Sequence, residues 1–298
     1  MNPEKTKYQE FISKFESSSI FSQPWWLDIV CGSANWNVVI AERDGKAIAS
    51  LPYYTKRRMF LKIITQPPLT QTIQPLFDER FSSNFDKKAK ITSELIRKIP
   101  VTSKFQMNLH ADFTNWLPFY WQGYSQTTFY SFILESGISV DSIWENMSGK
   151  RRTEIRKSEN SEVFINDKGS FSTFFKLYQS TFIRKKRKPP FKKPFLENLV
   201  NSCLEKKVGK MLFAVDKKGV PLSCAFFIWD DKRTYYLLGG LNSEVDTKGA
   251  QSLLLWQAIK TSLESSRDFD FEGSMDKGVG NFFSSYGADL VPYFGISK

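Results

Sequence analysis

Three carboxylates at alternate positions near the end of the chain have the residue type and spacing for acid–base chemistry. Asp268, Asp270 and Glu272 alternate with two phenylalanines. On a β-strand the acids would point to one face and the rings to the other, because side chains alternate along a strand. Neighbouring carboxylates repel one another, and partial burial then raises the pKa of at least one of them. Such a group suits recognition or deprotonation of an amine. The alternative is an acidic edge that faces solvent and is balanced by lysines.

A pair of tyrosines and a pair of glycines lie on a second predicted strand, over 234–241. Tyr235 and Tyr236 precede Gly239 and Gly240. Only one tyrosine can face a cleft, and we expect this to be Tyr236, with the other packed in the core. Glycines let a ligand approach the backbone closely, and backbone N–H groups stabilise negative charge on a carbonyl oxygen. We therefore expect Gly239 and Gly240 to contact a substrate.

A basic helix is the first candidate for anion binding. Residues 150–157 carry five basic side chains and one acid. Arg152 and Arg156 are four residues apart and share a helix face, with Arg151 and Lys157 beside them. Arginine recognises phosphates and carboxylates through two parallel hydrogen bonds. We expect these four residues to bind an anionic substrate; the alternative is a solvated helix face.

A basic loop is the second candidate. Residues 184–193 hold seven positive charges and no acid, and two prolines interrupt the run. This loop and the basic helix over 150–157 are expected to border one cleft and to close over an anionic ligand. A solubilising loop without a ligand explains the composition equally well.

The charge of the chain is concentrated in its second part. The net charge is +11; residues 1–145 hold 16 basic and 14 acidic residues, so they contribute +2 and the remainder +9. A basic second part indicates an anionic partner, whether phosphate, nucleic acid or an acidic headgroup.

The cysteines and the hydropathy pattern set the expected location. Cys31, Cys203 and Cys224 are widely spaced and form no zinc-binding or disulfide pattern, so we expect no metal site. The first residues lack the apolar stretch of a signal peptide, and no run of the sequence is apolar enough for a membrane span. We therefore expect a cytoplasmic protein.

The order of predicted elements favours two α/β domains with mixed sheets, at 1–145 and 146–298. Each has helices, then an antiparallel hairpin or meander, then a helix and another strand. In the first part we expect helices at 6–17, 24–30 and 85–98 and strands at 36–40, 47–54, 104–109 and 129–134. In the second we expect helices at 141–158, 170–182, 194–205, 249–264 and 280–286 and strands at 211–216, 222–229, 234–241 and 268–272, with a last strand reaching 296.

Several short stretches, taken together and in order, resemble the Fem-type family. They are QPWWLD at 23–28, KRRTEIRK at 150–157, YYLLGG at 235–240, FDFEGS at 269–274, FF at 282–283, YGA at 286–288 and PY at 292–293. Fem-type proteins are aminoacyl and acyl transferases related to the GNAT superfamily and build peptidoglycan cross-bridges. The resemblance implies two tandem GNAT-like domains, with the active site in the second.

One loop departs from the GNAT pattern. GNAT acetyltransferases bind the coenzyme A pyrophosphate on a glycine-rich loop at a helix start, where backbone N–H groups meet the phosphates. The matching place here contains Lys248, Gly249 and Ala250, which we expect to contact the donor, but Asp246 and Gln251 stand where the pattern has other residues. This resembles Fem-type enzymes, whose donor is aminoacyl-tRNA, more than users of acetyl-CoA.

The resemblance implies transfer of an acyl or aminoacyl group onto an amine. We expect Glu272, Asp270 and Tyr236 to be catalytic. The donor is acyl-CoA or aminoacyl-tRNA, neither held as a tightly bound cofactor, and the acceptor is a small molecule or a cell-wall-precursor-like amine. The alternative is a non-catalytic protein that binds nucleic acid or another anionic ligand on a GNAT-like scaffold.

Overall fold

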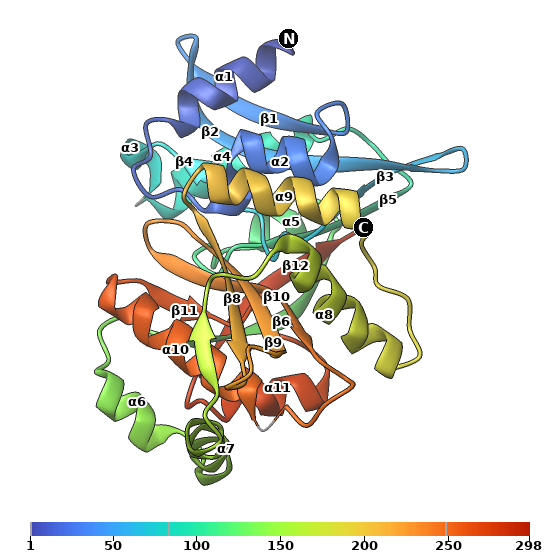
Figure 1. Cartoon of the computed structure of the whole chain (residues 1–298). Coiled ribbons are helices and arrows are strands. Elements are labelled where there is room, and N and C mark those ends of the chain that lie inside the picture. Colours follow the sequence, from blue (N-terminus) through green and yellow to red (C-terminus); the bar gives the residue numbers. More distant parts are fainter. Residues whose placement is uncertain (1, 83, 248) are drawn as a thin grey trace. The chain divides into compact units, whose positions relative to one another are not determined.

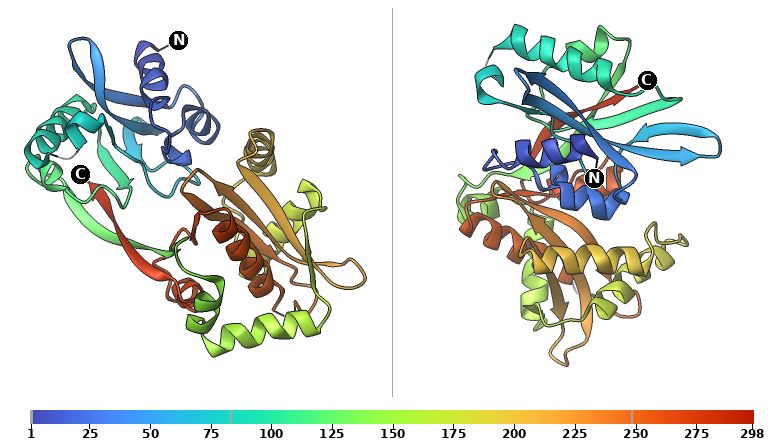
Figure 2. Two further views of the ribbon diagram at one scale, coloured as in Figure 1. Left: turned by 90° about the vertical axis from the view of Figure 1, so that its left-hand side faces the viewer. Right: turned by 90° about the horizontal axis from the view of Figure 1, so that it is seen from above.

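The chain forms two compact units. The computed structural model describes residues 2–82, 84–247 and 249–298. The first unit comprises Met1–Tyr130 and Val291–Lys298, and the second comprises Ser131–Leu290 (Figures 1 and 2). The end of the chain belongs to the first unit because the last strand pairs with a strand of that unit.

The first unit is built on a mixed sheet with the order β1-β2-β3-β5-β12, and β4 also pairs with β2. Neighbours are antiparallel except β3 and β5. Its strands are β1 (Trp36–Arg43), β2 (Lys46–Arg58), β3 (Leu61–Thr65), β4 (Leu76–Phe77), β5 (Lys104–Leu109) and β12 (Asp289–Ser297). Its helices are α1 (Pro3–Ile12), η1 (Ile20–Ser22), α2 (Pro24–Cys31), α3 (Glu79–Ser82), α4 (Phe85–Lys98) and α5 (Leu117–Tyr120).

The second unit is built on a sheet with the order β6-β11-β10-β9-β8-β7. Only β10 and β11 are parallel, and β8, β9 and β10 form the expected antiparallel meander. Its strands are β7 (Phe164–Asn166), β8 (Gly209–Val215), β9 (Pro221–Trp229), β10 (Arg233–Leu241) and β11 (Asp268–Asp270). Strand β6 (Ser125–Leu134) begins in the first unit and pairs with β11 through Ile133 and Leu134, in the second. The helices of the second unit are α6 (Val140–Asn146), α7 (Gly149–Asn160), α8 (Phe171–Arg184), α9 (Lys193–Glu205), α10 (Ala250–Glu264) and α11 (Lys277–Ser284). The prediction of α/β folding with mixed sheets is confirmed.

Helices cover both faces of the second sheet. On one face Phe226 of β9 meets Phe174 of α8, with ring centroids 6.4 Å apart. The neighbouring Phe227 points the other way, into a core cluster that includes Leu254 and Ile259 of α10. Figure 2 (left) shows α8 and α10 on either side of these strands. The side chains of β10 are therefore divided between an α8 face and an α10 face.

The helix predicted over 141–158 is two helices, α6 and α7. Met147 and Ser148 have extended backbone angles, and the hydroxyl of Ser148 accepts a hydrogen bond from the N–H of Arg151 at 3.2 Å. A serine at this position caps a new helix, because it satisfies one of the N–H groups that lack a partner in the first turn.

Two kinds of feature are absent from the described part of the chain. Its helices are all too short or too polar to cross a membrane. No group of three or more histidine, cysteine, aspartate or glutamate side chains is placed to hold a metal ion.

Candidate active site

The two parallel strands of the second unit separate after three paired residues. Arg233, Thr234 and Tyr235 of β10 pair with 268–270 of β11. Beyond that point β10 continues along β9, whereas the N–H of Phe271 donates to the carbonyl oxygen of Phe132 in β6 at 3.0 Å. Each strand therefore follows a different neighbour, and the sheet opens at the carboxyl ends of β10 and β11. Ligands of open α/β sheets bind at such ends.

A β-bulge lies beside this opening. Tyr236 pairs with Phe227 and Leu238 with Phe226, so Leu237 is an extra residue in β10. A bulge leaves its extra residue outside the ladder and turns the strand locally. The backbone of Leu237 is thus a candidate for contact with a substrate carbonyl at the point where the sheet opens.

Glu272 stands two residues beyond the last pair of β11 and is unusual in both its backbone conformation and the surroundings of its carboxylate. Its φ of +62° is in the left-handed region, which a residue with a side chain seldom adopts. Its Oε1 atom is buried and has no hydrogen-bond partner in the described structure. Burial, and then the negative charge of Asp270, raise the pKa of the Glu272 carboxyl well above its ordinary value. Strain and an unsatisfied buried acceptor at one residue are typical of functional sites.

Asp270 is fully buried and its carboxylate is bound by its neighbours. The hydroxyl of Ser131 and the N–H of Glu272, the latter at 2.7 Å, donate to its Oδ1 atom. Arg233 approaches Oδ2 at 3.5 Å and also reaches Asp268 at 3.4 Å. Asp270 therefore holds the turn that places Glu272, and its own oxygens are largely occupied.

The expectation that all three carboxylates share one strand face is met by two of them. Asp268 and Asp270 both lie on the side of Arg233. Strand β11 ends at Asp270, and the left-handed backbone of Glu272 breaks the alternation. The predicted strand over 268–272 is thus shorter by two residues.

Tyr236 lies on the α10 face, immediately after the last residue of β10 that pairs with β11. The side-chain amide of Gln251, in the first turn of α10, donates to its hydroxyl at 3.1 Å. Burial, and then the charges of Cys224 and Tyr286, raise the pKa of Tyr236 above its ordinary value, so the phenol is neutral at physiological pH. A β-carbon on Gly239 would lie 2.0 Å from this hydroxyl, so the tyrosine hydroxyl rests directly over Gly239.

Gly240 and Tyr235 belong to the opposite face. A β-carbon on Gly240 would lie 2.5 Å from the backbone of Leu177 and Tyr178 in α8. Gly240 is therefore needed for helix packing, whereas Gly239 underlies the tyrosine. The hydroxyl of Tyr235 donates to Asp230 at 3.0 Å, and the residue is buried. As expected, only one of the two tyrosines faces the α10 side.

The start of α10 is covered by α7. Gly249 has a φ of +79°, and a β-carbon there would lie 2.7 Å from the carbonyl oxygen of Glu154. The carboxylate of Glu154 accepts a hydrogen bond from Ser252 in the first turn at 2.8 Å. Ala250 is fully buried and its N–H donates to the carbonyl oxygen of Thr247 at 2.7 Å. The start of α10 is thus covered by Glu154, whose carboxylate is itself paired with Arg151. Lys248, predicted to contact the donor, lies outside the described residues.

Arg151 has an internal role in this unit. It is buried, forms an ion pair with Glu154 and donates to the hydroxyls of Ser252 and Ser285. Its guanidinium also lies over the rings of Phe282 and Tyr286, 4.1 and 4.9 Å from their centres. These contacts tie α7 to α10 and α11 and occupy the group that was expected to bind substrate.

The other basic residues of α7 divide between packing and solvent. Arg152 donates to the carbonyl oxygens of Trp144 and Glu145 at 3.1 and 2.7 Å, at the end of α6. Arg156 lies over the ring of Trp144 at 5.4 Å. Lys157 is exposed. The arginine pair at i and i+4 therefore stabilises the α6–α7 corner.

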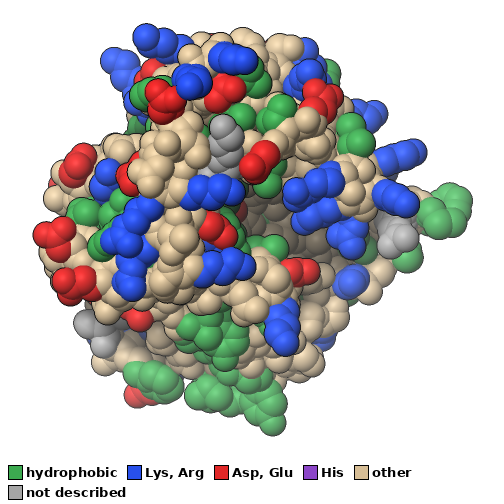
Figure 3. Space-filling model, turned by 60° about the horizontal axis from the view of Figure 1, so that its bottom comes forward, with side chains coloured by type: hydrophobic (Ala, Val, Ile, Leu, Met, Phe, Trp, Pro, Cys, Tyr) green, Lys and Arg blue, Asp and Glu red, His purple; other side chains and the backbone are tan. Residues whose placement is uncertain are grey.

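The basic loop after α8 is an exposed cationic segment of the second unit. All seven of its basic side chains, at 184–188 and 192–193, are exposed. Figure 3 shows lysine and arginine side chains in several groups on the face drawn, with acidic side chains beside some of them. The charge on that face thus lies in local groups.

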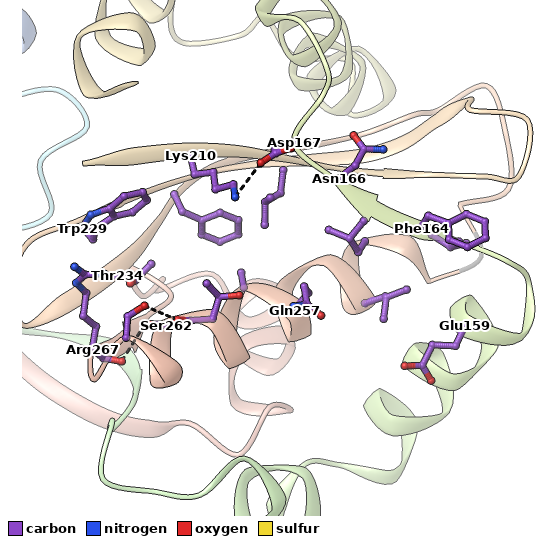
Figure 4. A pocket seen from close by; sticks show the side chains of 18 residues that line it. Glu159, Phe164, Asn166, Asp167, Lys210, Trp229, Thr234, Gln257, Ser262 and Arg267 are labelled. Atoms are coloured by element: carbon purple, nitrogen blue, oxygen red, sulfur yellow. Dashed lines mark hydrogen bonds and ion pairs between the residues drawn. The ribbon is translucent and has the colours of Figure 1, made fainter. Parts of the chain in front are cut away.

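A pocket of about 600 Å³ lies between α10 and the strands β7–β10 (Figure 4). Its walls include Leu212, Phe227 and Leu253, and at its rim Lys210 pairs with Asp167 at 2.9 Å. It lies where β10 begins and is still paired with β11, so it is separate from the opening of the sheet. It contains none of the predicted site residues.

Residues 148–282 match the family described as acetyltransferase (GNAT) domain. FemX aligns over 99% of this chain and 96% of its own, with a TM-score of 0.72 and 14% identity. The fold is GNAT-like. No curated protein sequence matches the chain significantly.

Two further solved structures share this GNAT-like fold. The C-terminal domain of a putative lysylphosphatidylglycerol synthetase from Agrobacterium fabrum aligns over 99% of this chain and 89% of its own, with a TM-score of 0.59 and 9% identity. A tandem GNAT protein from the clavulanic acid biosynthesis pathway aligns over 100% and 95%, with a TM-score of 0.52 and 9% identity. The resemblance to the Fem-type and tandem GNAT groups is confirmed at the level of the fold.

Sequence reasoning missed several residues of the GNAT-like opening. Ser131 and Arg233 bind Asp270, and Gln251 binds Tyr236, although they are far from these partners in sequence. Gln251 was noted only as a departure from the GNAT loop. Nothing in the local sequence marks these three residues, because their roles come from the pairing of β6, β10 and β11 and the docking of α10.

Proposed function

We propose that the chain is an N-acyltransferase or aminoacyltransferase whose reaction takes place at the opening between β10 and β11. The observation that carries this proposal is Glu272, a strained residue with a buried, unpartnered carboxylate oxygen and a raised pKa directly beyond the end of β11. A base of this kind suits an amine, which must lose a proton before or while it attacks.

Each group at the opening has a part in the proposed reaction. The acceptor nitrogen forms a bond to the donor's carbonyl carbon, and the bond from that carbon to sulfur or oxygen breaks. Glu272 takes the proton from the amine, and Tyr236, neutral at physiological pH, gives a proton to the leaving atom. The backbone at the Leu237 bulge and at Gly239 is the candidate for stabilising the carbonyl oxygen. Asp270 positions Glu272 through the 2.7 Å hydrogen bond to its N–H.

The donor in this proposal is an acyl or aminoacyl ester of a large anionic carrier. Pyrophosphate binding at the start of α10 is disfavoured because α7 packs against it: the carbonyl oxygen of Glu154 lies against Gly249, and the ion pair of Glu154 with Arg151 binds Ser252 in the first turn. This supports aminoacyl-tRNA over acyl-CoA, as do the similarities to FemX and to a lysylphosphatidylglycerol synthetase domain. We propose an amine acceptor related to a cell-wall or lipid precursor, and a cytoplasmic location, with which the three free, buried cysteines are consistent.

A second candidate function is favoured by the exposed loop 184–193. Seven solvated cations bind a polyanion through phosphate contacts whether or not a reaction follows. A non-catalytic binding protein would use this loop and have no need of Glu272.

The experiment that tests the proposal compares Glu272→Gln with the matched control Glu264→Gln, an exposed acid near the end of α10. Transfer from acyl-CoA and from aminoacyl-tRNA to a panel of amines is measured together with tRNA binding. We expect Glu272→Gln to abolish transfer and to leave binding unchanged, with the control unaffected in both. Binding without transfer by the unaltered protein across all donors, or transfer that survives Glu272→Gln, contradicts the proposal.

A further inference from the structure

The hairpin between β2 and β3 carries an exposed apolar tip. Phe60 is fully exposed, Met59 is 87% exposed and Leu61 55%. They form the turn of the hairpin and the first residue after it. Isolated exposed apolar residues are ordinary, but three successive large ones at the end of a projecting element create a patch that water solvates poorly.

This tip stands clear of the rest of its sheet. The pairing of β1 with β2 ends at Tyr54, and that of β3 with β5 begins at Ile63. Residues 57–62 pair with one another as the end of a two-stranded ribbon, which is joined to the neighbouring chain only at its base, where the carbonyl oxygen of Lys62 accepts a hydrogen bond from the N–H of Ser103 at 3.1 Å. Figures 1 and 2 show this hairpin projecting from the first unit. A partner can reach the tip without disturbing the sheet.

The residues at the turn of this hairpin are not those that such a turn favours. The turn has two central residues, and the first, Met59, has a φ of +54°. Glycine is the usual residue at such a position, because methionine pays a steric cost there. An apolar pair that opposes the preference of a tight turn, and that packs against nothing, indicates a role outside the folding of the hairpin.

Cations surround the tip, and no acid accompanies them. Lys56, Arg57 and Lys62 are exposed. In the described structure no carboxylate forms an ion pair with any of these three. The sequence contains no aspartate or glutamate between Asp44 and Asp78. An apolar tip ringed by cations matches the layers of an anionic bilayer, whose headgroups attract cations and whose acyl region accepts apolar side chains.

We propose that the β2–β3 hairpin docks the protein on the surface of an anionic lipid membrane. Met59, Phe60 and Leu61 enter the boundary between headgroups and acyl chains, while the neighbouring cations contact lipid phosphates. This is peripheral binding by a hairpin, and it does not depend on the proposed transfer reaction.

The test uses the full chain and sedimentation with vesicles of phosphatidylglycerol and phosphatidylcholine, or of phosphatidylcholine alone. The variant Met59→Gly with Phe60→Ser removes the apolar pair and supplies the residues that this turn prefers, so its thermal stability should equal or exceed that of the unaltered chain. Val101→Ser is the matched control, because Val101 is an exposed apolar residue outside the hairpin.

We expect the tip variant to lose about 30-fold or more in partition onto anionic vesicles, equivalent to about 2 kcal/mol, and the control to lose nothing. Each of Lys56, Arg57 and Lys62 changed to glutamine should cost roughly fivefold, and added salt should weaken binding. Equal binding by the tip variant, or equal binding to neutral and anionic vesicles, overturns the proposal.

A labelled variant gives a second measurement that keeps the hairpin's other residues. The native cysteines Cys31, Cys203 and Cys224 are buried, so Met59→Cys offers one accessible thiol for an environment-sensitive fluorophore. Its emission should shift to the blue on anionic vesicles. An unchanged emission overturns the proposal. So does a tip variant that abolishes self-association in sedimentation velocity while the unaltered chain ignores vesicles, since the partner is then a second copy.

Discussion

Replacing Glu272 by glutamine removes one ionisable group and preserves the size of the side chain. Two consequences follow from its environment. A general base accelerates a reaction by about 10²- to 10⁴-fold, so the rate of transfer should fall by about 10²-fold or more. The stability should change in the opposite direction, because the folded protein no longer has to hold a carboxylate in a buried position.

The sign of the stability effect follows from the raised pKa of Glu272. Below the pKa of the unfolded chain the carboxyl is protonated in both states, and glutamine and glutamate differ only by constant terms. Above it the unfolded state releases its proton first. The free energy of unfolding therefore falls by up to about 1.4 kcal/mol per pH unit until the folded-state pKa is reached. The glutamine variant lacks this loss. Its advantage should therefore grow from pH 4 towards pH 8.

The assay is chemical denaturation of the unaltered chain, Glu272→Gln and the control Glu264→Gln at pH 4, 6 and 8, beside rates of transfer at each pH at which the protein is folded. The rate of the unaltered chain should rise with pH through a range above that of an ordinary carboxylate. A constant stability difference across pH between Glu272→Gln and the unaltered chain would refute the reasoning that this carboxyl is held in an unfavourable, buried state.

Three other changes separate the roles assigned above. Gly240→Ala should destabilise the fold by about 3 kcal/mol through a clash with the α8 backbone, whereas Gly239→Ala should mainly displace the Tyr236 hydroxyl and lower the rate of transfer. Denaturation and kinetics of both variants check this. A greater loss of stability in Gly239→Ala than in Gly240→Ala contradicts it. Changing Lys185 and Lys186 to glutamine should weaken salt-dependent tRNA binding without altering the melting temperature. Changing Arg152 and Arg156 to glutamine should instead lower the melting temperature, because Arg152 holds the end of α6. Equal losses of tRNA binding by the two double variants would restore the idea that the basic helix and the basic loop border one cleft. The dissociation constant of coenzyme A, measured by calorimetric titration, should lie above the low micromolar range, which corresponds to a binding free energy of about −8 kcal/mol. A dissociation constant within that range would contradict the argument that Glu154 and α7 disfavour pyrophosphate at the start of α10.

Elements whose signals are local could be predicted from the sequence. Helix α4 and strand β5 have the predicted bounds, 85–98 and 104–109, because an amphipathic period and an alternating pattern lie inside each segment. The Asp44-Gly45 turn was also expected, and both residues have positive φ. The β2–β3 hairpin was missed because Met59 and Phe60 carry no turn signal.

The candidate site shows the limit of local reasoning. Glu272, Asp270 and Tyr236 could be selected by residue type and spacing, but their separate roles follow from contacts with residues far away in sequence. The same holds for Arg151, whose charge suggested a ligand and whose partners are Glu154, Ser252 and Ser285. A basic residue on a helix has no local mark that distinguishes an internal ion pair from a substrate contact.

The return of the last strand to the first unit has a consequence for synthesis of the chain. β12 pairs with β5 through residues 294–297, which leave the ribosome only after the whole of the second unit. The sheet of the first unit therefore stays incomplete, with an unpaired strand edge, until these residues have been made. Unpaired edges and long-range pairings are slow to fold and open to aggregation, so a chaperone would find its substrate in the amino-terminal part of the nascent protein.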